Sequence, residues 1–454
     1  MQMLWARHCL TAEGWREGVR VGLGIDGRIA SVTPGGPEGA EPVGILLPAP
    51  ANLHSHAFQR AMAGLSERRG EAGADSFWTW RTLMYRFLDQ LDPEDVEAVA
   101  ALVQMESLEA GFASIGEFHY LHHRPDGGAY ENPAEMSARI VAAAAETGIG
   151  LTLLPVLYER GGCDGRALGA GQRRFGSDPA AFARLHEGAG AALAALDHDA
   201  RLGVAPHSLR AVSPAGLSSA AALAAEAPIH MHIAEQQAEV AEVEAAYGAR
   251  PVAWLLDAIP VDARWCLIHA THMSPAETEG LAQSGAVAGL CPVTEANLGD
   301  GLFPGPAFLE AGGRFGVGSD SNTRIDLAEE LRTLEYGQRL RDLARNRMAD
   351  ATRSTGRLLF ETAAGAGAAA LGRDAGTIAV GRLADLVALD AEAPDTAGRS
   401  GDTLLDSFVF AAGQGLVREV WSAGRHMVRA GRHIARDILR ARYATRIAAL
   451  RDRL

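Results

Sequence analysis

Hydrophobic residues in the middle of the chain form eight short apolar segments, most of them followed by a stretch with helical periodicity. Helices are predicted most clearly at 93–110 and 327–345. Such alternation is typical of an α/β fold, either a closed (β/α)₈ TIM-like barrel or an open, doubly wound sheet. The first segment is a weak strand on propensity because it contains two prolines. The segments span residues 44–53, 113–118, 150–156, 202–206, 228–232, 265–269, 286–291 and 315–320.

Both ends of the chain carry a different pattern, in which short strands alternate with glycine and proline turns. Residues 18–24 and 28–32 show it near the N-terminus, and residues 376–390 and 417–424 show it near the C-terminus. Two separated β-rich flanks predict one small β-sandwich domain built from both chain ends. The predicted division is a β-sandwich of residues 1–48 and 366–434, a barrel of residues 49–365, and a surface helix at 435–454.

A long insertion at 66–85 follows the first predicted strand and contains Trp78, Trp80 and Arg81. Loops of this length at the mouth of a barrel often act as lids or binding elements. We expect the two tryptophans to pack within such a lid rather than to stack on a ligand.

Composition narrows the classes of function. The chain has 42 basic and 56 acidic residues, a formal net charge of −14, which disfavours nucleic acid and anionic membrane as partners. All the basic residues are arginine, because the sequence contains no lysine. Chemistry that needs lysine is excluded, including the Walker phosphate loop, pyridoxal Schiff bases and lysine aldolases. A carboxylated lysine bridging two metal ions is excluded as well, which favours a site with a single metal.

The four cysteines, Cys9, Cys163, Cys266 and Cys291, are far apart and form no paired motif, so neither a disulfide framework nor a zinc ribbon is expected. Cys291 follows a predicted strand and either lines the barrel mouth or is a buried core thiol. The N-terminus shows no signal-peptide pattern, and no apolar run approaches about 18 residues. We therefore expect a cytoplasmic protein.

Four residues that could bind a metal ion each follow a predicted strand: His54, His56, His232 and Asp320. The ends of different strands converge at one mouth of a barrel, so residues far apart in sequence can share one ion there. This convergence favours the closed barrel. Three imidazoles and a carboxylate suit Zn²⁺, so the sequence predicts one zinc ion per chain. The ordinary alternatives are structural histidines and a turn-forming aspartate.

Candidate catalytic groups lie next to these ligands. Glu235 follows His232 by three residues and can shuttle a proton to a leaving nitrogen, although it could instead cap a helix. His269 ends a predicted strand and could contact the attacking water; it lies nearer to the strand end than His272 does. Asp320 can accept a proton from that water as well as bind the metal.

The order of these residues resembles that of the amidohydrolase superfamily, in its branch of deaminases with a single zinc. The stretches 54–60, 206–212, 232–236 and 318–324 resemble formimidoylglutamate deiminases, and the similarity extends over essentially the whole chain. The resemblance implies hydrolysis of N-formimino-L-glutamate to N-formyl-L-glutamate and ammonia in histidine degradation. It also implies zinc on the four ligands, catalytic roles for Glu235 and His269, and a homodimer.

Residues of the predicted substrate pocket give a separate argument about the kind of substrate. Related nucleoside and nucleobase deaminases have Ala-Pro-Tyr after the histidine that corresponds to His207, whereas this chain has Ser-Leu-Arg210. An arginine can donate two hydrogen bonds to a carboxylate, so a small dicarboxylate is the expected substrate. The candidate substrate-binding residues, supported by the resemblance, are Gln59, Arg81, Tyr120, His207 and Arg210.

Three other functions remain open at this point. One is deamination of an aromatic ring, such as guanine or an adenine-containing nucleoside. A second is ring-opening hydrolysis of an amide in a related intermediate, and a third is a catalytically inactive barrel that serves as an assembly protein.

Overall fold

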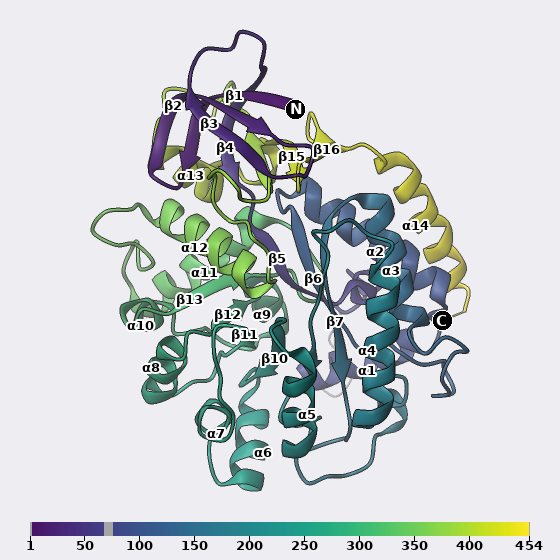
Figure 1. Cartoon of the computed structure of the whole chain (residues 1–454). Helices are drawn as coiled ribbons and strands as arrows, with labels where there is room; N and C mark the ends of the chain where they lie inside the picture. Colours follow the sequence, from purple (N-terminus) through teal and green to yellow (C-terminus); the bar gives the residue numbers. More distant parts are fainter. Residues whose placement is uncertain (1, 68–75, 454) are drawn as a thin grey trace.

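A computed structural model describes residues 2–67 and 76–453, and its central part is a barrel of parallel strands surrounded by helices (Figure 1). Residues 68–75 of the predicted insertion lie outside the described residues. The predicted (β/α)₈ barrel is confirmed. In order around the barrel, the strands are β5 (Ala51–Ser55), β6 (Ser114–His119), β7 (Gly150–Leu157), the short pair β8 (Arg201–Leu202) and β9 (Ala205–Pro206), β10 (Ile229–Ile233), β11 (Trp265–His269), β12 (Val287–Leu290) and β13 (Arg314–Val317).

Two seams close the barrel and exclude the open-sheet alternative. Val204 bridges Ile229 in parallel at one seam, and Ser55 bridges Asp320 at the other. At the second seam, His56 N–H donates to the Asp320 carbonyl and Asp320 N–H donates to the His54 carbonyl, both at 2.9 Å. The contact between the first and last strands therefore runs through three of the predicted metal ligands.

Several of the outer helices begin with the same local signal, an Asp or Ser followed by Pro. The side chains of Asp92, Asp178, Ser213 and Ser274 each accept a hydrogen bond from the N–H three residues on. Proline fits the first helical position because its missing N–H would have no intrahelical partner. The helices around the barrel are α2 (Pro93–Glu109), α3 (Glu135–Thr147), α4 (Pro179–Leu193), α5 (Pro214–Ala224), α6 (Gln237–Tyr247), α7 (Pro251–Ala258), α8 (Pro275–Gln283), α9 (Pro292–Leu298), α10 (Gly305–Glu310), α11 (Leu327–Asp342) and α12 (Thr355–Ala370).

The helix predicted at 93–110 corresponds to α2, but the one predicted at 327–345 ends earlier. α11 stops at Asp342 because Leu343 has a φ of 50°, in the left-handed region. Periodicity alone could not indicate that stop, since no glycine or proline marks it.

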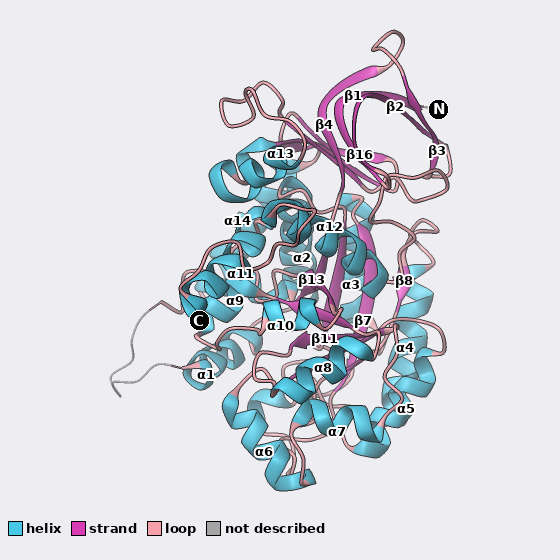
Figure 2. Ribbon diagram, turned by 90° about the vertical axis from the view of Figure 1, so that its left-hand side faces the viewer, coloured by secondary structure: helices cyan, strands magenta, loops and turns pink. Residues whose placement is uncertain are grey.

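The two chain ends meet in one mixed sheet, which lies at one end of the molecule (Figure 2). Its centre joins β1 in parallel to β4, and β4 in antiparallel fashion to β14. The sheet has its own hydrophobic core, which includes Leu4, Val21, Leu46 and Trp421, and is consistent with the predicted sandwich. Its strands, in spatial order, are β17 (Arg432–His433), β16 (Arg425–Arg429), β15 (Val417–Ser422), β14 (Leu386–Leu389), β4 (Glu41–Pro48), β1 (Gln2–Thr11), β2 (Gly14–Leu23) and β3 (Ile29–Pro34).

The junctions between the two parts differ in detail from the sequence pattern. The apolar segment 44–53 was predicted as one barrel strand, but its first half belongs to β4 of the terminal sheet and only its second half to β5. Ala49 and Pro50 separate the two strands. The proposed boundary between 365 and 366 falls inside α12, which packs on β13 and β5. The division into domains stays a prediction.

The remaining elements lie outside the barrel and the terminal sheet. α14 (Arg436–Arg451) occupies most of the helix predicted at 435–454 and packs along α2, where Arg446 Nε lies 2.8 Å from Asp95 Oδ1. None of the helices in the described part of the chain is long and apolar enough to cross a membrane. The other elements are η1 (Ala57–Met62), α1 (Phe77–Leu88), η2 (Ala170–Gln172), α13 (Asp402–Ser407), the π-helical turn η3 (Phe408–Ala412) and η4 (Gln414–Leu416).

A buried ion-pair network joins the barrel to the terminal sheet and should contribute strongly to stability. Arg373, with a fully buried side chain, lies 3.0 Å from Asp385 and 3.1 Å from Asp199. Arg373→Met would leave two buried carboxylates short of a partner, so we expect the free energy of unfolding to fall by about 3 kcal/mol in urea titrations. Arg382→Met, which removes an exposed partner of Asp374, should cost less than about 1 kcal/mol. Equal losses would contradict this account.

Candidate active site

The predicted metal ligands form a compact cluster at the barrel mouth. The Nε2 atom of His54 lies 3.2 Å from that of His56 and 3.0 Å from that of His232. Asp320 Oδ1 lies 3.2 Å from His56 Nε2 and 3.6 Å from His54 Nε2. Ligands of a tetrahedral zinc ion, with bonds of about 2.0–2.1 Å, lie about 3.3 Å from one another. The distances from His54 to the other three ligands, and from His56 to Asp320, are close to this value, so the cluster could hold a single metal ion such as zinc.

The protonation of the three imidazoles also suits a metal. Burial, reinforced by the neighbouring histidines, lowers the pKa of His54 and His232 well below the ordinary value. Burial lowers the pKa of His56 to about 3. His56 Nδ1–H donates to the Phe118 carbonyl at 2.9 Å, which leaves the lone pair of Nε2 directed at the cluster. Three neutral imidazoles whose Nε2 atoms converge could bind one metal ion together.

Local backbone conformation aims the side chains from the strand ends. His54 and His56 lie two residues apart at the end of β5, so both point the same way. His269 has a φ of 69° at the end of β11, and Asp320 has a φ of 46° after β13. A non-glycine residue in this region costs on the order of 1 kcal/mol, and such residues concentrate at functional sites.

Three carboxylates surround His269. Its Nε2 lies 3.9 Å from Glu235 Oε1 and 3.9 Å from Asp320 Oδ2, and its Nδ1 lies 3.3 Å from Glu295 Oε1. Burial lowers the pKa of His269, but these negative charges outweigh it and raise the pKa to about 10. Burial raises the pKa of Asp320 to about 7, against the opposing charge of His269. The site thus joins a cationic imidazole to a carboxyl group that titrates near neutrality.

Sequence reasoning missed Glu295, which orients His269. It occupies the first turn of α9, and its Oε1 atom also accepts the Cys291 N–H at 3.0 Å. In the sequence a glutamate at this position looks like an ordinary helix-capping residue. The available signal was its position just after the strand predicted at 286–291. Cys291 itself is fully buried and does not line the cavity, as the core-thiol alternative expected.

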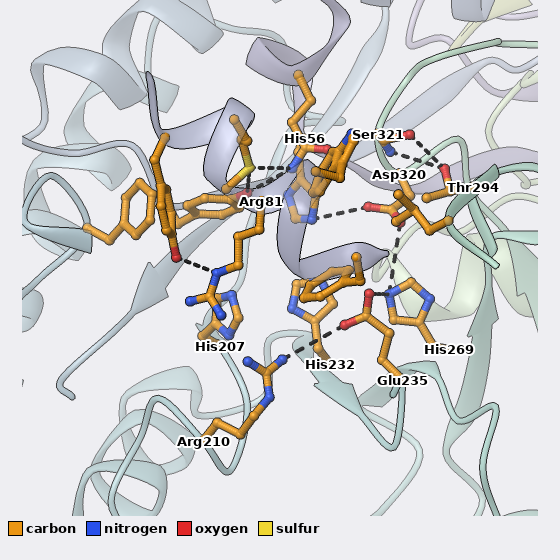
Figure 3. Close-up of a pocket in the computed structure, with 18 of the residues that line it drawn as sticks. His56, Arg81, His207, Arg210, His232, Glu235, His269, Thr294, Asp320 and Ser321 are labelled. Carbon is orange, nitrogen blue, oxygen red and sulfur yellow. Dashed lines mark hydrogen bonds and ion pairs between the residues drawn. The ribbon is translucent and has the colours of Figure 1, made fainter. Parts of the chain in front are cut away.

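A cavity of about 540 Å³, partly open to solvent, extends from this cluster. In Figure 3 the side chains of His56, His232, Glu235, His269 and Asp320 point toward one another, with Arg81 and Arg210 reaching in from the other side. All five predicted substrate-binding residues line the cavity, whereas His54 is buried beneath it. The lining residues that the sequence did not single out as substrate-binding are Phe77, Trp80, Met84, Tyr85, Tyr158, Phe175, Thr294, Leu298 and Ser321.

The two arginines in the cavity differ in their surroundings. Arg210, on the loop after β9, lies 3.8 Å from Glu235 and 3.9 Å from Glu239, both buried. Arg81, on α1, donates to the hydroxyls of Tyr85 and Tyr158. Trp80 lines the cavity, while Trp78 is 43% exposed and lies outside the lining.

Comparison with known proteins places the chain in a family. The model of the Amidohydrolase family matches residues 45–427, so the chain belongs to the amidohydrolase family. Residues 1–41 match a second model, described as the N-terminal domain of formimidoylglutamate deiminase HutF.

Particular relatives narrow the comparison. A formimidoylglutamate deiminase from Pseudomonas aeruginosa is 50% identical over 96% of this chain and 97% of its own. A 5-methylthioadenosine/S-adenosylhomocysteine deaminase from Natronomonas pharaonis is 28% identical over 77% of this chain and 74% of its own. The crystal structure of an amidohydrolase from Brucella melitensis superposes with a TM-score of 0.95, at 50% identity over 99% of this chain and all of that one. A zinc-bound adenosine deaminase from Xanthomonas campestris, at 23% identity, shares the fold with a TM-score of 0.81 over 99% of this chain and 98% of its own.

Removing one imidazole should empty the metal site. We expect His232→Ala to lose its bound metal on dialysis, because the remaining ligands no longer complete a tetrahedral shell. His230→Ala is the matched control, since His230 Nε2–H donates to the Ala370 carbonyl at 2.8 Å and the residue lies outside the cluster. Elemental analysis of both purified variants measures metal per chain. Equal retention by the two variants would remove His232 from the ligand set.

Proposed function

We propose that this protein hydrolyses N-formimino-L-glutamate to N-formyl-L-glutamate and ammonia, using one zinc ion per chain. The observation that carries the proposal is the meeting of the cluster of three histidines and Asp320 with the acid Glu235 and two arginines at one cavity. The relative from Pseudomonas aeruginosa, similar over nearly the whole chain, supports it.

His54, His56, His232 and Asp320 would hold the metal. When bound, zinc acts as a Lewis acid that makes water nucleophilic at neutral pH. The mixed nitrogen and oxygen donor set and its tetrahedral spacing favour this ion, and the absence of lysine favours a single one.

The protein's own groups would move the protons. Glu235 donates a proton to the imine nitrogen of the substrate, while the Asp320 carboxylate accepts one from the attacking water. His269, held by Glu295, keeps a positive charge close to both carboxylates. Water adds to the formimino carbon, and the bond from that carbon to the former imine nitrogen breaks, while the bond to the α-nitrogen of glutamate stays. A second proton reaches the departing ammonia through Glu235.

The charges on the cavity wall match a dicarboxylate. Arg81 and Arg210 each present a guanidinium, and burial beside these cations lowers the pKa of His207, which is therefore neutral. Gln59 donates to the Tyr120 hydroxyl at 2.8 Å, so these two side chains form a polar pair on the same wall. A substrate with two carboxylates would balance both arginines.

The main alternative is deamination of a purine or of an adenine-containing nucleoside. The aromatic side chains of the cavity, such as Trp80 and Phe175, favour it to some degree, and the 28% identical relative belongs to that class. A neutral purine would leave the Arg81 guanidinium without an anion and would offer Arg210 no carboxylate beyond Glu235 and Glu239, so the dicarboxylate is the better match. Participation in histidine degradation, a cytoplasmic location and a homodimer stay predictions, and sedimentation of the purified protein would test the dimer.

The decisive experiment is ammonia release by zinc-loaded protein. We expect kcat/KM for N-formimino-L-glutamate to exceed that for guanine and adenosine by at least about a thousandfold, because the purines carry no carboxylate for Arg81 to bind. Glu235→Gln should lower kcat by about 10²–10⁴-fold while metal content stays unchanged. Preferred turnover of a purine would select the alternative, and full turnover by Glu235→Gln would remove its role.

Glu295 should support turnover without touching the substrate. Glu295→Gln keeps the acceptor for Cys291 N–H but removes the negative charge that faces His269, so we expect kcat to fall about 10–100-fold with metal retained. Glu330→Gln is the matched control, because Glu330 is also buried and accepts a backbone N–H, that of Val293 at 3.0 Å, but lies outside the cavity lining. A similar kcat for both variants would contradict the role of Glu295.

A further inference from the structure

One corner of the cavity is built from three segments that are far apart in the chain. Arg81 comes from α1, Tyr158 follows β7, and Gln172 ends η2. Arg81 and Tyr158 line the cavity, where Figure 3 shows the Arg81 side chain among the lining residues. Tyr158 is 2% exposed, so its hydroxyl depends on partners within the protein or on a ligand.

The hydrogen bonds at Tyr158 Oη have a fixed direction. Gln172 Oε1 accepts the Gly169 N–H at 2.8 Å, which assigns the amide orientation and makes Nε2 the donor to Tyr158 Oη, also at 2.8 Å. Arg81 can only donate, and its Nη2 lies 3.2 Å from the same oxygen. Both lone pairs of the hydroxyl are therefore occupied by incoming donors.

The proton of this hydroxyl has no acceptor within the described chain. A phenolic oxygen accepts two hydrogen bonds and donates one, and the described residues provide only the two donors. A buried donor without an acceptor is energetically unfavourable, so a ligand that supplies an acceptor would bind more tightly.

The positive charge in this corner also lacks a partner within the described chain. Among the residues that the structure describes, no carboxylate pairs with Arg81, whereas Arg210 faces both Glu235 and Glu239. The Arg81 guanidinium instead lies over the rings of Trp78 and Tyr85, at 5.7 and 5.2 Å from their centroids. An unbalanced cation beside an unused O–H donor fits an anionic oxygen.

We propose that Tyr158 is a specificity-determining residue, whose hydroxyl donates to one carboxylate of the substrate while Arg81 balances its charge. Gln172 is the positioning residue, since its amide fills a lone pair of Tyr158 and turns the O–H toward the cavity. This inference rests on the proposed function for the identity of the anion. In this assignment Arg81 and Tyr158 bind one carboxylate of the substrate, and Arg210 binds the other.

Kinetics of two variants with three substrates test the assignment. Tyr158→Phe removes the donor, and Gln172→Glu offers a carboxylate that captures its proton. For N-formimino-L-glutamate we expect both variants to raise KM about 10–100-fold, with kcat changed less than about threefold. Analogues lacking either the α- or the γ-carboxylate identify the contact: the variants should change KM for only one of them. An unchanged KM, or equal effects with both analogues, would overturn the proposal.

A binding measurement separates this inference from the proposed function. Calorimetric titration with glutarate, a dicarboxylate that undergoes no reaction, should show about tenfold or more weaker binding by Tyr158→Phe than by the unaltered protein. Tyr247→Phe, on α6 and outside the cavity lining, should bind glutarate normally. If the unaltered protein releases no ammonia but glutarate binding depends on Tyr158, the proposed substrate is wrong. The proposed contact of Tyr158 and Arg81 with a carboxylate is then supported. If glutarate does not bind, or binds equally well to Tyr158→Phe, the proposed contact between Tyr158 and a carboxylate is overturned.

Discussion

The site depends on the closure of the barrel between its first and last strands. The reciprocal hydrogen bonds of Asp320 with His54 and His56 pair the backbone at the very residues whose side chains form the ligand cluster. A shift of one residue at this seam would turn alternate side chains to the opposite face. The same pairing holds Asp320 in its left-handed conformation, so the backbone strain at the site is supported by the sheet.

A second constraint is electrostatic. Glu235, Glu295 and Asp320 surround His269, while the neighbouring imidazoles of the cluster are neutral because they are buried. This side of the cavity is arranged for a cation and for proton transfer. Arg81 and Arg210 give the facing side the opposite charge, which makes a chain with a net charge of −14 locally suited to anions. The overall charge therefore says little about the ligand.

Patterns in the chain anticipated much of this arrangement. Apolar segments followed by histidines or an aspartate marked the strand ends, and α2 follows directly from its Asp-Pro start and its periodicity. Other features could not be anticipated. The division of 44–53 between two sheets depends on which partner strands are near, and the stop of α11 depends on one residue, Leu343, in a left-handed conformation. Glu295 and Tyr158 have ordinary local surroundings and gain their roles only from neighbours on other elements, His269 at the end of β11 for Glu295 and Gln172 of η2 for Tyr158.

The sequence by itself determined the kinds of chemistry within reach: nitrogen and oxygen ligands at strand ends, an acid close to one of them, arginine as the only fixed cation, and no lysine. Tertiary structure decided which of these groups meet, how far apart their atoms lie, and which charges remain unbalanced. The reason is physical. Local propensity acts over a few residues, whereas the register of a closed barrel and the desolvation of its mouth are set by the packing of all its strands and helices together.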